Sequence, residues 1–366
     1  MRDPRQKKLA RILVEYSTAV APGDVVMLQY QDGTPVEFVR EIQTAALKRG
    51  ARCVRPVAVN EELEENFYRA ASPAALEYFP THELAFMKAA QVYIGIGAPR
   101  NSRALSGVPA GVLGARQRLL RPILDRRVNH TRWVVTRYPT PAQAQDAGMS
   151  LADLEDFYFR ACLVDWARIR DRQEPLRRLL ASASAVSIKA PDTDLRFSVA
   201  GMGAVSCHGD RNMPDGEVYT APVAGSVEGT IVFNTVCERQ SRLVVNPRLV
   251  FKKGRVVECG ADRGAVDLEA ILSVDSGARV PGEFSFGLNR RIRRPTGNTL
   301  FDEKIAGSVH LALGSAYEDC DNGNRSALHW DLVRLCSDAE IRLDGVLVQA
   351  RGRFLLPELA PLNRMG

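Results

Sequence analysis

The stretch 22–59, PGDVVMLQYQDGTPVEFVREIQTAALKRGARCVRPVAV, has the pattern of a strand, a helix and a second strand. The apolar run at 24–29 follows a Pro-Gly turn and predicts a strand. Apolar residues then recur at helical spacing over 35–48, and Gly50 is a typical helix stop. Residues 52–59 predict the second strand. Strands that alternate with helices in this way favour a mainly parallel sheet.

The same alternation continues through the first half of the chain. We predict an opening amphipathic helix at 5–16, further strands at 89–95 and 132–136, and a long helix at 151–172. Residues 1–182 are therefore predicted to form an N-terminal α/β domain with a mainly parallel sheet.

The sequence changes in character near residue 180. Short β-like runs punctuated by Gly, Asn, Asp and Pro follow one another from there on. These runs are 186–190, 195–199, 230–234, 242–245, 256–259, 309–313 and 346–350. We predict a strand-rich α+β C-terminal domain over 183–366, with the boundary between 174 and 184.

Composition narrows the class of protein. The chain has 366 residues, 45% of them apolar and 25% charged, which is typical of a folded protein of about two domains. Its apolar runs are too short for a membrane helix, and we expect no secretory signal at its start. Seven cysteines without a C-x-x-C pair fit reduced thiols. We therefore expect a cytoplasmic protein that does not bind membranes.

The net charge of +6 raises the question of nucleic acid. The basic excess lies in the first half, where it is spread out and mostly arginine. The sequence has no basic run with interleaved aromatic residues and no helix-turn-helix or RNA-binding signature. A solvated basic surface is the better interpretation, and we expect no nucleic-acid partner.

Two short motifs in the first half do not support the chemistry they suggest. Gly95-Ile96-Gly97 follows a predicted strand, but Arg100 stands where a dinucleotide-binding turn needs its third glycine. His82-Glu83 begins like a zinc-binding H-E-x-x-H, but Phe86 replaces the second histidine. The first is interpreted as a plain turn, and the second is rejected.

The second half concentrates histidines and acids in short segments rich in Gly and Asn. His329 and Asp331 are two residues apart, so in a strand both side chains project from the same face. His310 begins an apolar strand, where an imidazole needs a partner. Glu217 and Glu283 each follow a glycine and open an apolar stretch, where a buried carboxylate is costly unless it is paired or bound to a metal.

Together with Glu303, these residues could hold two divalent metal ions. Four carboxylates and two imidazoles suffice for a pair of ions with one bridging carboxylate. Mixed oxygen and imidazole ligands suit Zn, Co or Mn. Each residue taken singly also has an ordinary structural explanation, such as an exposed turn glutamate or a satisfied core histidine.

Four longer motifs in this half resemble one known family. They are NMPDGEVYTAP at 212–222, PGEFSFGLN at 281–289, LFDEKIAGSVHLALGSAY at 300–317 and NRSALHWD at 324–331. In this order they resemble the thermophilic-type metallo-aminopeptidases of peptidase family M29, the aminopeptidase T/aminopeptidase S group. The first half agrees more loosely, through its opening helix and its PGDVV strand.

The resemblance implies a co-catalytic site with two divalent metal ions (Zn, Co or Mn) that hydrolyses N-terminal peptide bonds. By this resemblance the metal ligands are Glu217, Glu283, His310, His329 and Asp331, with Glu283 as the bridge. Glu303 matches a family acid that is either a ligand or a neighbour of the ligands. Tyr317 matches the active-site tyrosine, and Glu283 is also a candidate catalytic residue. The resemblance further implies a homodimer and a peptide or small amide substrate.

Other functions stay open at this stage. His310, His329 and Asp331 alone could form the iron site of a ring-cleaving dioxygenase, a class to which distant relatives of the fold are similar. Only residues 318–328 separate Tyr317 from His329, which is shorter than in better-studied members. This compact form leaves an amidase on a non-peptide substrate possible, as well as a catalytically silent metal-binding protein.

Overall fold

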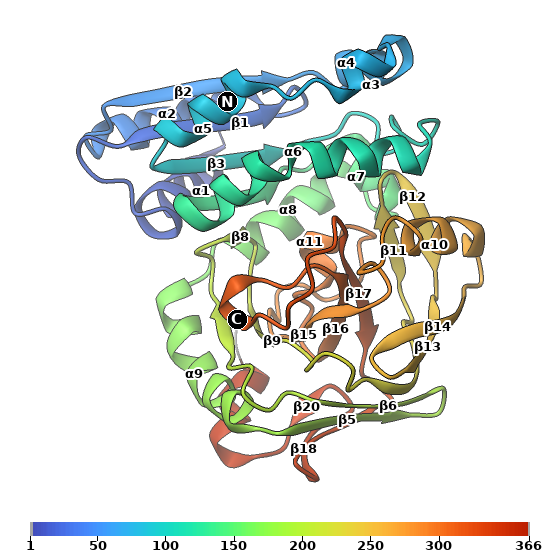
Figure 1. The fold of residues 1–366 in the computed structure, drawn as a ribbon. Helices are drawn as coiled ribbons and strands as arrows, with labels where there is room; N and C mark the ends of the chain where they lie inside the picture. Colours follow the sequence, from blue (N-terminus) through green and yellow to red (C-terminus); the bar gives the residue numbers. More distant parts are fainter. Residues whose placement is uncertain (1–2, 365–366) are drawn as a thin grey trace. The chain divides into compact units, whose positions relative to one another are not determined.

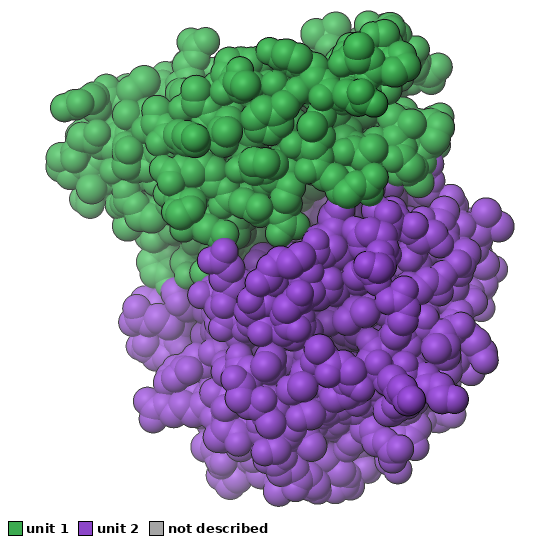
Figure 2. All heavy atoms as spheres, in the orientation of Figure 1, with its two compact units in different colours: residues 1–164, 209–215 green, residues 165–208, 216–366 purple. Residues whose placement is uncertain are grey.

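The computed structural model describes residues 3–364, and the chain divides into two compact units (Figure 2). One unit is residues 1–164 with 209–215, and the other is 165–208 with 216–366. The sequence-based boundary between residues 182 and 183 stays a prediction. By packing, the helix at 166–182 belongs to the second unit.

The first unit contains a five-stranded sheet whose neighbouring strands all run parallel, in the order β2-β1-β3-β4-β8 (Figure 1). The strands are β1 (Val25–Gln31), β2 (Cys53–Val59), β3 (Val92–Gly97), β4 (Arg132–Arg137) and β8 (Asn212–Met213). Val26, Ile94 and Val134 on its strands are fully buried, as expected for a parallel sheet whose faces are covered. This confirms the predicted α/β class of the first half.

Helices connect the strands of this unit, and polar side chains begin several of them. They are α1 (Pro4–Arg11), α2 (Val36–Lys48), α3 (Glu61–Ala70), α4 (Pro73–Glu77), α5 (Thr81–Ala89), α6 (Ala110–His130), α7 (Pro141–Asp146) and α8 (Leu151–Cys162). The side chains of Asn60, Ser72, Thr140 and Ser150 accept hydrogen bonds from the first turns of α3, α4, α7 and α8. Such caps satisfy backbone N–H groups that the helix leaves free.

Two predicted helices differ from the structure in their extent. The helix expected at 5–16 is α-helical only to Arg11, and Ile12–Ser17 continues as a π-helical turn. The helix expected at 151–172 is two helices, α8 and α9 (Trp166–Ser182). Leu163 leaves the helical conformation, and the Asp165 side chain caps the new helix by accepting a hydrogen bond from the Arg168 N–H. The local capping signal therefore outweighs the continuous apolar pattern.

The second unit is built on antiparallel sheets, which confirms the predicted strand-rich C-terminal half. An eight-stranded sheet has the order β14-β13-β10-β6-β5-β18-β19-β20, and a five-stranded sheet has the order β17-β16-β15-β9-β7. A separate hairpin pairs β11 with β12.

The strands of the eight-stranded sheet are β5 (Ala185–Ala190), β6 (Thr193–Ser198), β10 (Glu228–Val232), β13 (Arg248–Lys252), β14 (Arg255–Gly260), β18 (Glu340–Leu343), β19 (Val346–Ala350) and β20 (Arg353–Phe354). Those of the five-stranded sheet are β7 (Val205–Cys207), β9 (Glu217–Thr220), β15 (Pro281–Gly287), β16 (Ser308–Gly314) and β17 (His329–Leu335). The hairpin is β11 (Val236–Arg239) and β12 (Arg242–Val245). The predicted runs fall on these strands within a few residues.

Few helices occur in the second unit besides α9. They are α10 (Ala265–Leu272), α11 (Thr299–Asp302) and short 3-10 helices at Glu318–Cys320 and Pro357–Arg364. Among the described residues of the whole chain, no helix is long and apolar enough to cross a membrane.

Candidate metal centre

The candidate site lies on one face of the five-stranded sheet, where four neighbouring strands bring the predicted acids and histidines together. In the pairing register, Ala312 of β16 lies between Glu283 of β15 and Asp331 of β17. His310 is two residues before Ala312, and His329 lies opposite Gly314. Paired residues, and residues two apart, point to the same side of a sheet. The register therefore puts these four side chains on one face.

Two glycines allow the backbone to place the glutamates there. Gly216, directly before Glu217, has a φ of +118°, which side chains with a Cβ rarely adopt. A Cβ on Gly282, directly before Glu283, would lie 2.3 Å from the carbonyl oxygen of Gly314. The sheet register also shifts between Pro281 and Glu283. A glycine before each acid is thus a steric requirement of the site.

The imidazoles and carboxylates form two overlapping groups. His310 Nε2 lies 3.4 Å from Glu217 Oε2 and 3.2 Å from Glu283 Oε1. His329 Nε2 lies 3.6 Å from Glu283 Oε2 and 3.5 Å from Asp331 Oδ1. In each group the ligand atoms lie within 4.8 Å of one another, and Glu283 belongs to both. That is the position in which one carboxylate can bridge two cations.

The second nitrogen of each imidazole meets a backbone carbonyl. His310 Nδ1 lies 3.2 Å from the carbonyl oxygen of Glu303, and His329 Nδ1 lies 2.8 Å from that of Ser315. A carbonyl oxygen accepts a hydrogen bond from Nδ1–H, so the lone pair of the neutral ring is on Nε2. Both Nε2 atoms face the carboxylates, which is the orientation that a metal ligand needs.

Glu303 is held by the neighbouring Lys304. Lys304 is 1% exposed, and its Nζ lies 2.7 Å from Glu303 Oε1 and also forms a hydrogen bond with Glu217. Glu303 belongs to neither of the two groups of ligand atoms. Its side chain is therefore engaged with Lys304 at the edge of the site, and its role as a metal ligand stays a prediction.

The crowded acids perturb one another's pKa values. Burial, followed by the nearby Glu217 and Asp331 charges, raises the pKa of Glu283 above its ordinary value, although His310 opposes this. Burial likewise raises the pKa of Glu303 to about 8. Perturbed carboxyls of this kind gather at functional sites.

Burial acts on the pKa values of the histidines in the opposite direction, but the surrounding acids outweigh it. Burial alone would lower the pKa of His310, but its hydrogen bond with Glu283 and the charges of Glu217 and Asp331 raise it to about 10. For His329, burial is again outweighed, chiefly by Asp331, and the pKa rises to about 9. Without a metal, protons on the imidazoles thus stand in for part of the cationic charge that the acids attract.

One atom of the site has no hydrogen bond. Glu283 is 3% exposed, and its Oε2 has no hydrogen-bond partner among the described residues. A buried carboxylate oxygen without a partner is costly, whereas a bound cation would satisfy it. The donor set of imidazole nitrogens and carboxylate oxygens suits Zn, Co or Mn. The residues present therefore fit divalent metal ions.

Tyr317 lies beside the second group of ligand atoms. Its ring centroid is 4.9 Å from that of His329 and 5.8 Å from that of Tyr219. None of the described residues forms a hydrogen bond with its hydroxyl. Burial, with the nearby Glu283 and Asp331 charges, raises the pKa of this phenol well above its ordinary value. The hydroxyl thus keeps its proton and is available as a donor.

The short segment 318–328 is anchored by two asparagines. Asn322 Nδ2 donates to the carbonyl oxygens of Pro222 and Pro281. Asn324 Nδ2 donates to those of Gly277 and Val280. These bonds tie the segment to β15, the strand that carries Glu283, and to the residues just before it. The segment is short, but its backbone is held in place beside the site.

Sequence reasoning did not assign three further residues near the site. Lys304 lies in the motif at 300–317 and directly follows Glu303. This neighbouring acid was a sequence signal from which their ion pair could have been predicted. Ser285 Oγ donates to Glu217 Oε2 over 3.1 Å, and only the strand register reveals this contact. Arg239 of β11 follows Glu238, whose carbonyl accepts a hydrogen bond from the Trp330 indole. Nothing local in the sequence indicated that β11 and β17 are in contact.

Two ligand groups that share one carboxylate are an arrangement that suits metal-dependent hydrolysis. The sequence model of the family described as thermophilic metalloprotease (M29) matches residues 2–353. The chain therefore belongs to the thermophilic metalloprotease family M29, which confirms the resemblance and the prediction of a hydrolytic enzyme.

Individual relatives agree with this family. The chain is 27% identical to Aminopeptidase 2 of Geobacillus stearothermophilus, with 93% of each chain covered. It is 26% identical to Aminopeptidase T of Thermus thermophilus, over 96% of this chain and 98% of the relative.

Two solved structures share the fold. AmpT from Thermus thermophilus has a TM-score of 0.84 at 24% identity, over 96% of this chain and 99% of the other. The 2,5-dihydroxypyridine dioxygenase of Pseudomonas putida has a TM-score of 0.66 at 16% identity, over 98% and 99%. At these identities the similarity establishes the fold alone.

Proposed function

We propose that this protein is a metal-dependent aminopeptidase that hydrolyses N-terminal peptide bonds at a site for two divalent metal ions. The observation that carries the proposal is the position of Glu283, which belongs to both groups of ligand atoms and has an unsatisfied Oε2. Glu217, Glu283 and His310 would hold one ion, and Glu283, His329 and Asp331 the other. The aminopeptidase names of the relatives support the substrate class.

Bound Zn, Co or Mn would supply Lewis acidity and a lowered pKa of bound water. The protein's own residues divide the remaining tasks. Tyr317, whose raised pKa keeps the hydroxyl protonated, would donate a hydrogen bond to the developing oxyanion. Glu303, whose Oε1 lies 2.7 Å from Lys304 Nζ, would accept a proton during the reaction and pass it to the leaving amine. Lys304 holds the Glu303 carboxylate in place.

Metal content combined with a substrate panel tests this function. The purified protein would be reconstituted with Co, Zn or Mn, and its bound metal counted per chain. Aminoacyl chromophores, free peptides and N-acetylated copies of the same peptides would then be assayed. We expect two ions per chain and turnover of substrates with a free amine only. Absence of turnover on every peptide and chromophore would contradict the proposal and favour a silent binding protein.

A second candidate function has one observation in its favour. Asp331 Oδ1 lies 3.7 Å from His310 Nε2 and 3.5 Å from His329 Nε2, so these residues could bind a single Fe(II) as in a ring-cleaving dioxygenase. This alternative leaves Glu217 and Glu283 without a role. One iron per chain and oxygen consumption with dihydroxypyridines would favour it. Turnover of simple amides but not peptides would instead favour the amidase.

The homodimer and the cytoplasmic location belong to the same proposal. Both rest on the family resemblance and on the reduced-thiol composition. Sedimentation of the metal-loaded protein would measure the oligomeric state, with twice the chain mass as the expected result.

A further inference from the structure

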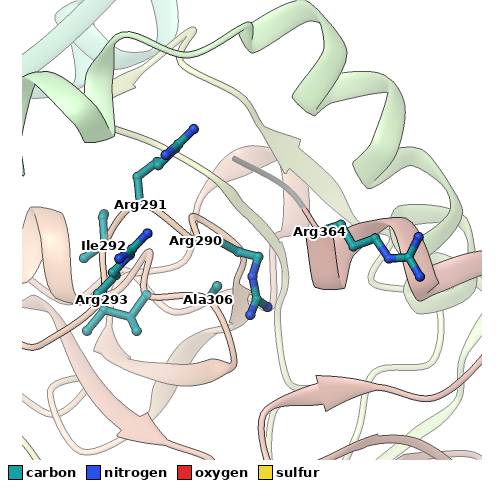
Figure 3. A pocket seen from close by; sticks show the side chains of 7 residues that line it. Arg290, Arg291, Ile292, Arg293, Ala306 and Arg364 are labelled. Carbon is teal, nitrogen blue, oxygen red and sulfur yellow. The ribbon is translucent and has the colours of Figure 1, made fainter.

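A pocket lined mainly by arginines lies in the second unit, outside the groups of ligand atoms described above. Its volume is about 500 Å³. It lies between the loop that follows β15 and the end of the C-terminal 3-10 helix (Figure 3). The residues that matter for its chemistry are Arg290, Arg291, Arg293, Arg364, Ile305 and Ala306.

The four arginines of this pocket lie together without a counter-charge among the described residues. None of these four guanidinium groups has a hydrogen bond or ion pair with another residue in the described range 3–364. Arg334, by contrast, pairs with Asp192 and Asp338. Four positive groups without an acid raise the local potential, and a concave wall concentrates the field. The pocket therefore attracts anions.

The backbone that carries three of these arginines is held in place. The Asn289 N–H donates to the Lys304 carbonyl over 2.8 Å, and the Asn289 side-chain oxygen accepts from the Arg291 N–H over 3.0 Å. Ile292 is 1% exposed and anchors the middle of the loop. Further along, Asp302 accepts hydrogen bonds from Thr296 and from the Gly297 N–H. The side chains are thus presented from a fixed frame, which lowers the entropic cost of binding.

The side chains themselves are not clamped together. In Figure 3, Arg290, Arg291 and Arg293 extend in different directions from the loop, and Arg364 stands on a separate segment. An anion with several oxygens can draw them together, because each guanidinium presents a fork of N–H donors that matches carboxylate and phosphate geometry.

We propose that this pocket binds a small, multiply charged oxyanion through Arg290, Arg291, Arg293 and Arg364. Its volume lies in the range of small-molecule sites, about 300–1,000 Å³. Carboxylate and phosphate groups share the chemistry that the arginines recognise. The proposal stands independently of the peptidase function, because none of these residues belongs to the ligand groups.

Anion binding to the metal-loaded protein tests this site. Inorganic phosphate, succinate and acetate would be titrated at constant ionic strength, with binding followed by calorimetry and by thermal unfolding. We expect saturable binding of a divalent anion, phosphate or succinate, and little of acetate. The tighter of the two divalent anions identifies the class of oxyanion. If neither binds saturably, the proposal is overturned.

Two variants separate this pocket from the metal centre, which could itself bind phosphate. In R290Q/R293Q the dissociation constant should rise at least about tenfold, because two charge-assisted contacts are lost. R294Q is the matched control, since Arg294 belongs to the same run but not to the pocket lining, and it should bind within about twofold of the unchanged protein.

Thermal unfolding guards against a folding artefact. Among residues 3–364 the side chains of Arg290 and Arg293 have no partners, so R290Q/R293Q should unfold at or above the temperature of the unchanged protein when anions are absent. Phosphate should raise the unfolding temperature of the unchanged protein by more than that of the variant. Unaltered phosphate affinity in folded R290Q/R293Q would refute the assignment.

Discussion

Glu61 in the first unit and Glu283 in the second are both buried, 8% and 3% exposed, but their surroundings differ. Glu61 accepts hydrogen bonds at both oxygens, from the Arg100 N–H over 2.9 Å and from the Asn101 N–H over 2.8 Å. Within the described part of the chain, the Glu283 carboxylate has one hydrogen-bonding neighbour, His310 Nε2 at 3.2 Å from Oε1, and its Oε2 has none.

This difference separates a structural acid from a functional one. Burying a carboxylate is costly unless hydrogen bonds or opposite charge compensate it. Backbone amides compensate Glu61 within the fold, so it holds the loop after β3 and needs nothing else. Glu283 lies among other acids with one oxygen unsatisfied among the described residues, so a bound cation would compensate it where the fold itself does not.

The largest expected effect is that of Glu283→Gln. Removing the shared carboxylate should prevent both cations from binding and lower kcat/KM by at least about 10³-fold, roughly 4 kcal/mol. The metal-free variant should unfold close to the metal-free natural chain, because it loses a costly buried carboxylate together with that group's attraction for the two imidazoles. Metal analysis, peptidase assays and urea unfolding in chelator would measure this.

The exposed Glu258 provides a matched control for that change. Glu258→Gln should leave metal content and turnover unchanged. Normal activity and normal metal content in Glu283→Gln would show that the assignment of this carboxylate is wrong.

The next effect is a pH dependence of the metal-free protein. The folded pKa values of His310 and His329, about 10 and about 9, lie above the ordinary value near 6.5. Their stabilisation is therefore complete below pH 6.5 and is lost as the pH rises through 9 to 10. Glu303, with its pKa raised to about 8, acts in the same direction. From pH 6.5 to 8 the two histidines alone should lower the free energy of unfolding by on the order of 3 kcal/mol.

Urea unfolding in chelator at several pH values would measure this slope. Glu283→Gln should flatten it, since Glu283 helps to raise the pKa of both imidazoles. Metal-loaded protein should lose the slope, because the ligands are then deprotonated throughout. A metal-free protein that becomes more stable over this interval would contradict the comparison.

A smaller effect is expected from Tyr317→Phe. The change removes one donor to the oxyanion and should lower kcat about 10²-fold, roughly 2.7 kcal/mol, with KM and metal content nearly unchanged. Tyr78→Phe, at an exposed tyrosine, is the matched control. A raised KM at constant kcat would instead assign Tyr317 to substrate binding.

The smallest effect is that of Glu61→Gln, and it completes the comparison. The amide keeps one acceptor but places an N–H group near the backbone donors, so the protein should lose about 2 kcal/mol of unfolding free energy. Metal content and turnover per folded molecule should not change. Denaturant unfolding would measure the stability of Glu61→Gln, and metal analysis its metal content. If this variant lost its metal but kept its full stability, Glu61 would not be a purely structural acid, and the distinction from Glu283 would be wrong.

Much of the fold could be predicted from the sequence because its signals are local. The alternation of strand and helix in 22–59 and the short runs after residue 180 correspond to the parallel and antiparallel sheets. The break between α8 and α9 was missed because the capping signal at Asp165 competes with a continuous apolar pattern. The π-helical turn at Ile12–Ser17 has no local signal that we identified.

The sequence by itself determined which residue types could hold metal and that His329 and Asp331 share one face. It also determined the family, since four motifs in order are specific. Which of these acids meet was decided only by the tertiary structure. The register of β9, β15, β16 and β17 brings the side chains from Glu217 through Asp331 into one site. The ion pair of Lys304 with Glu303 forms because both side chains are buried there. The arginine pocket likewise combines a loop near 290 with Arg364. The physical reason is that such contacts are long-range: strand register and packing set them, whereas local spacing constrains only the side to which each residue points.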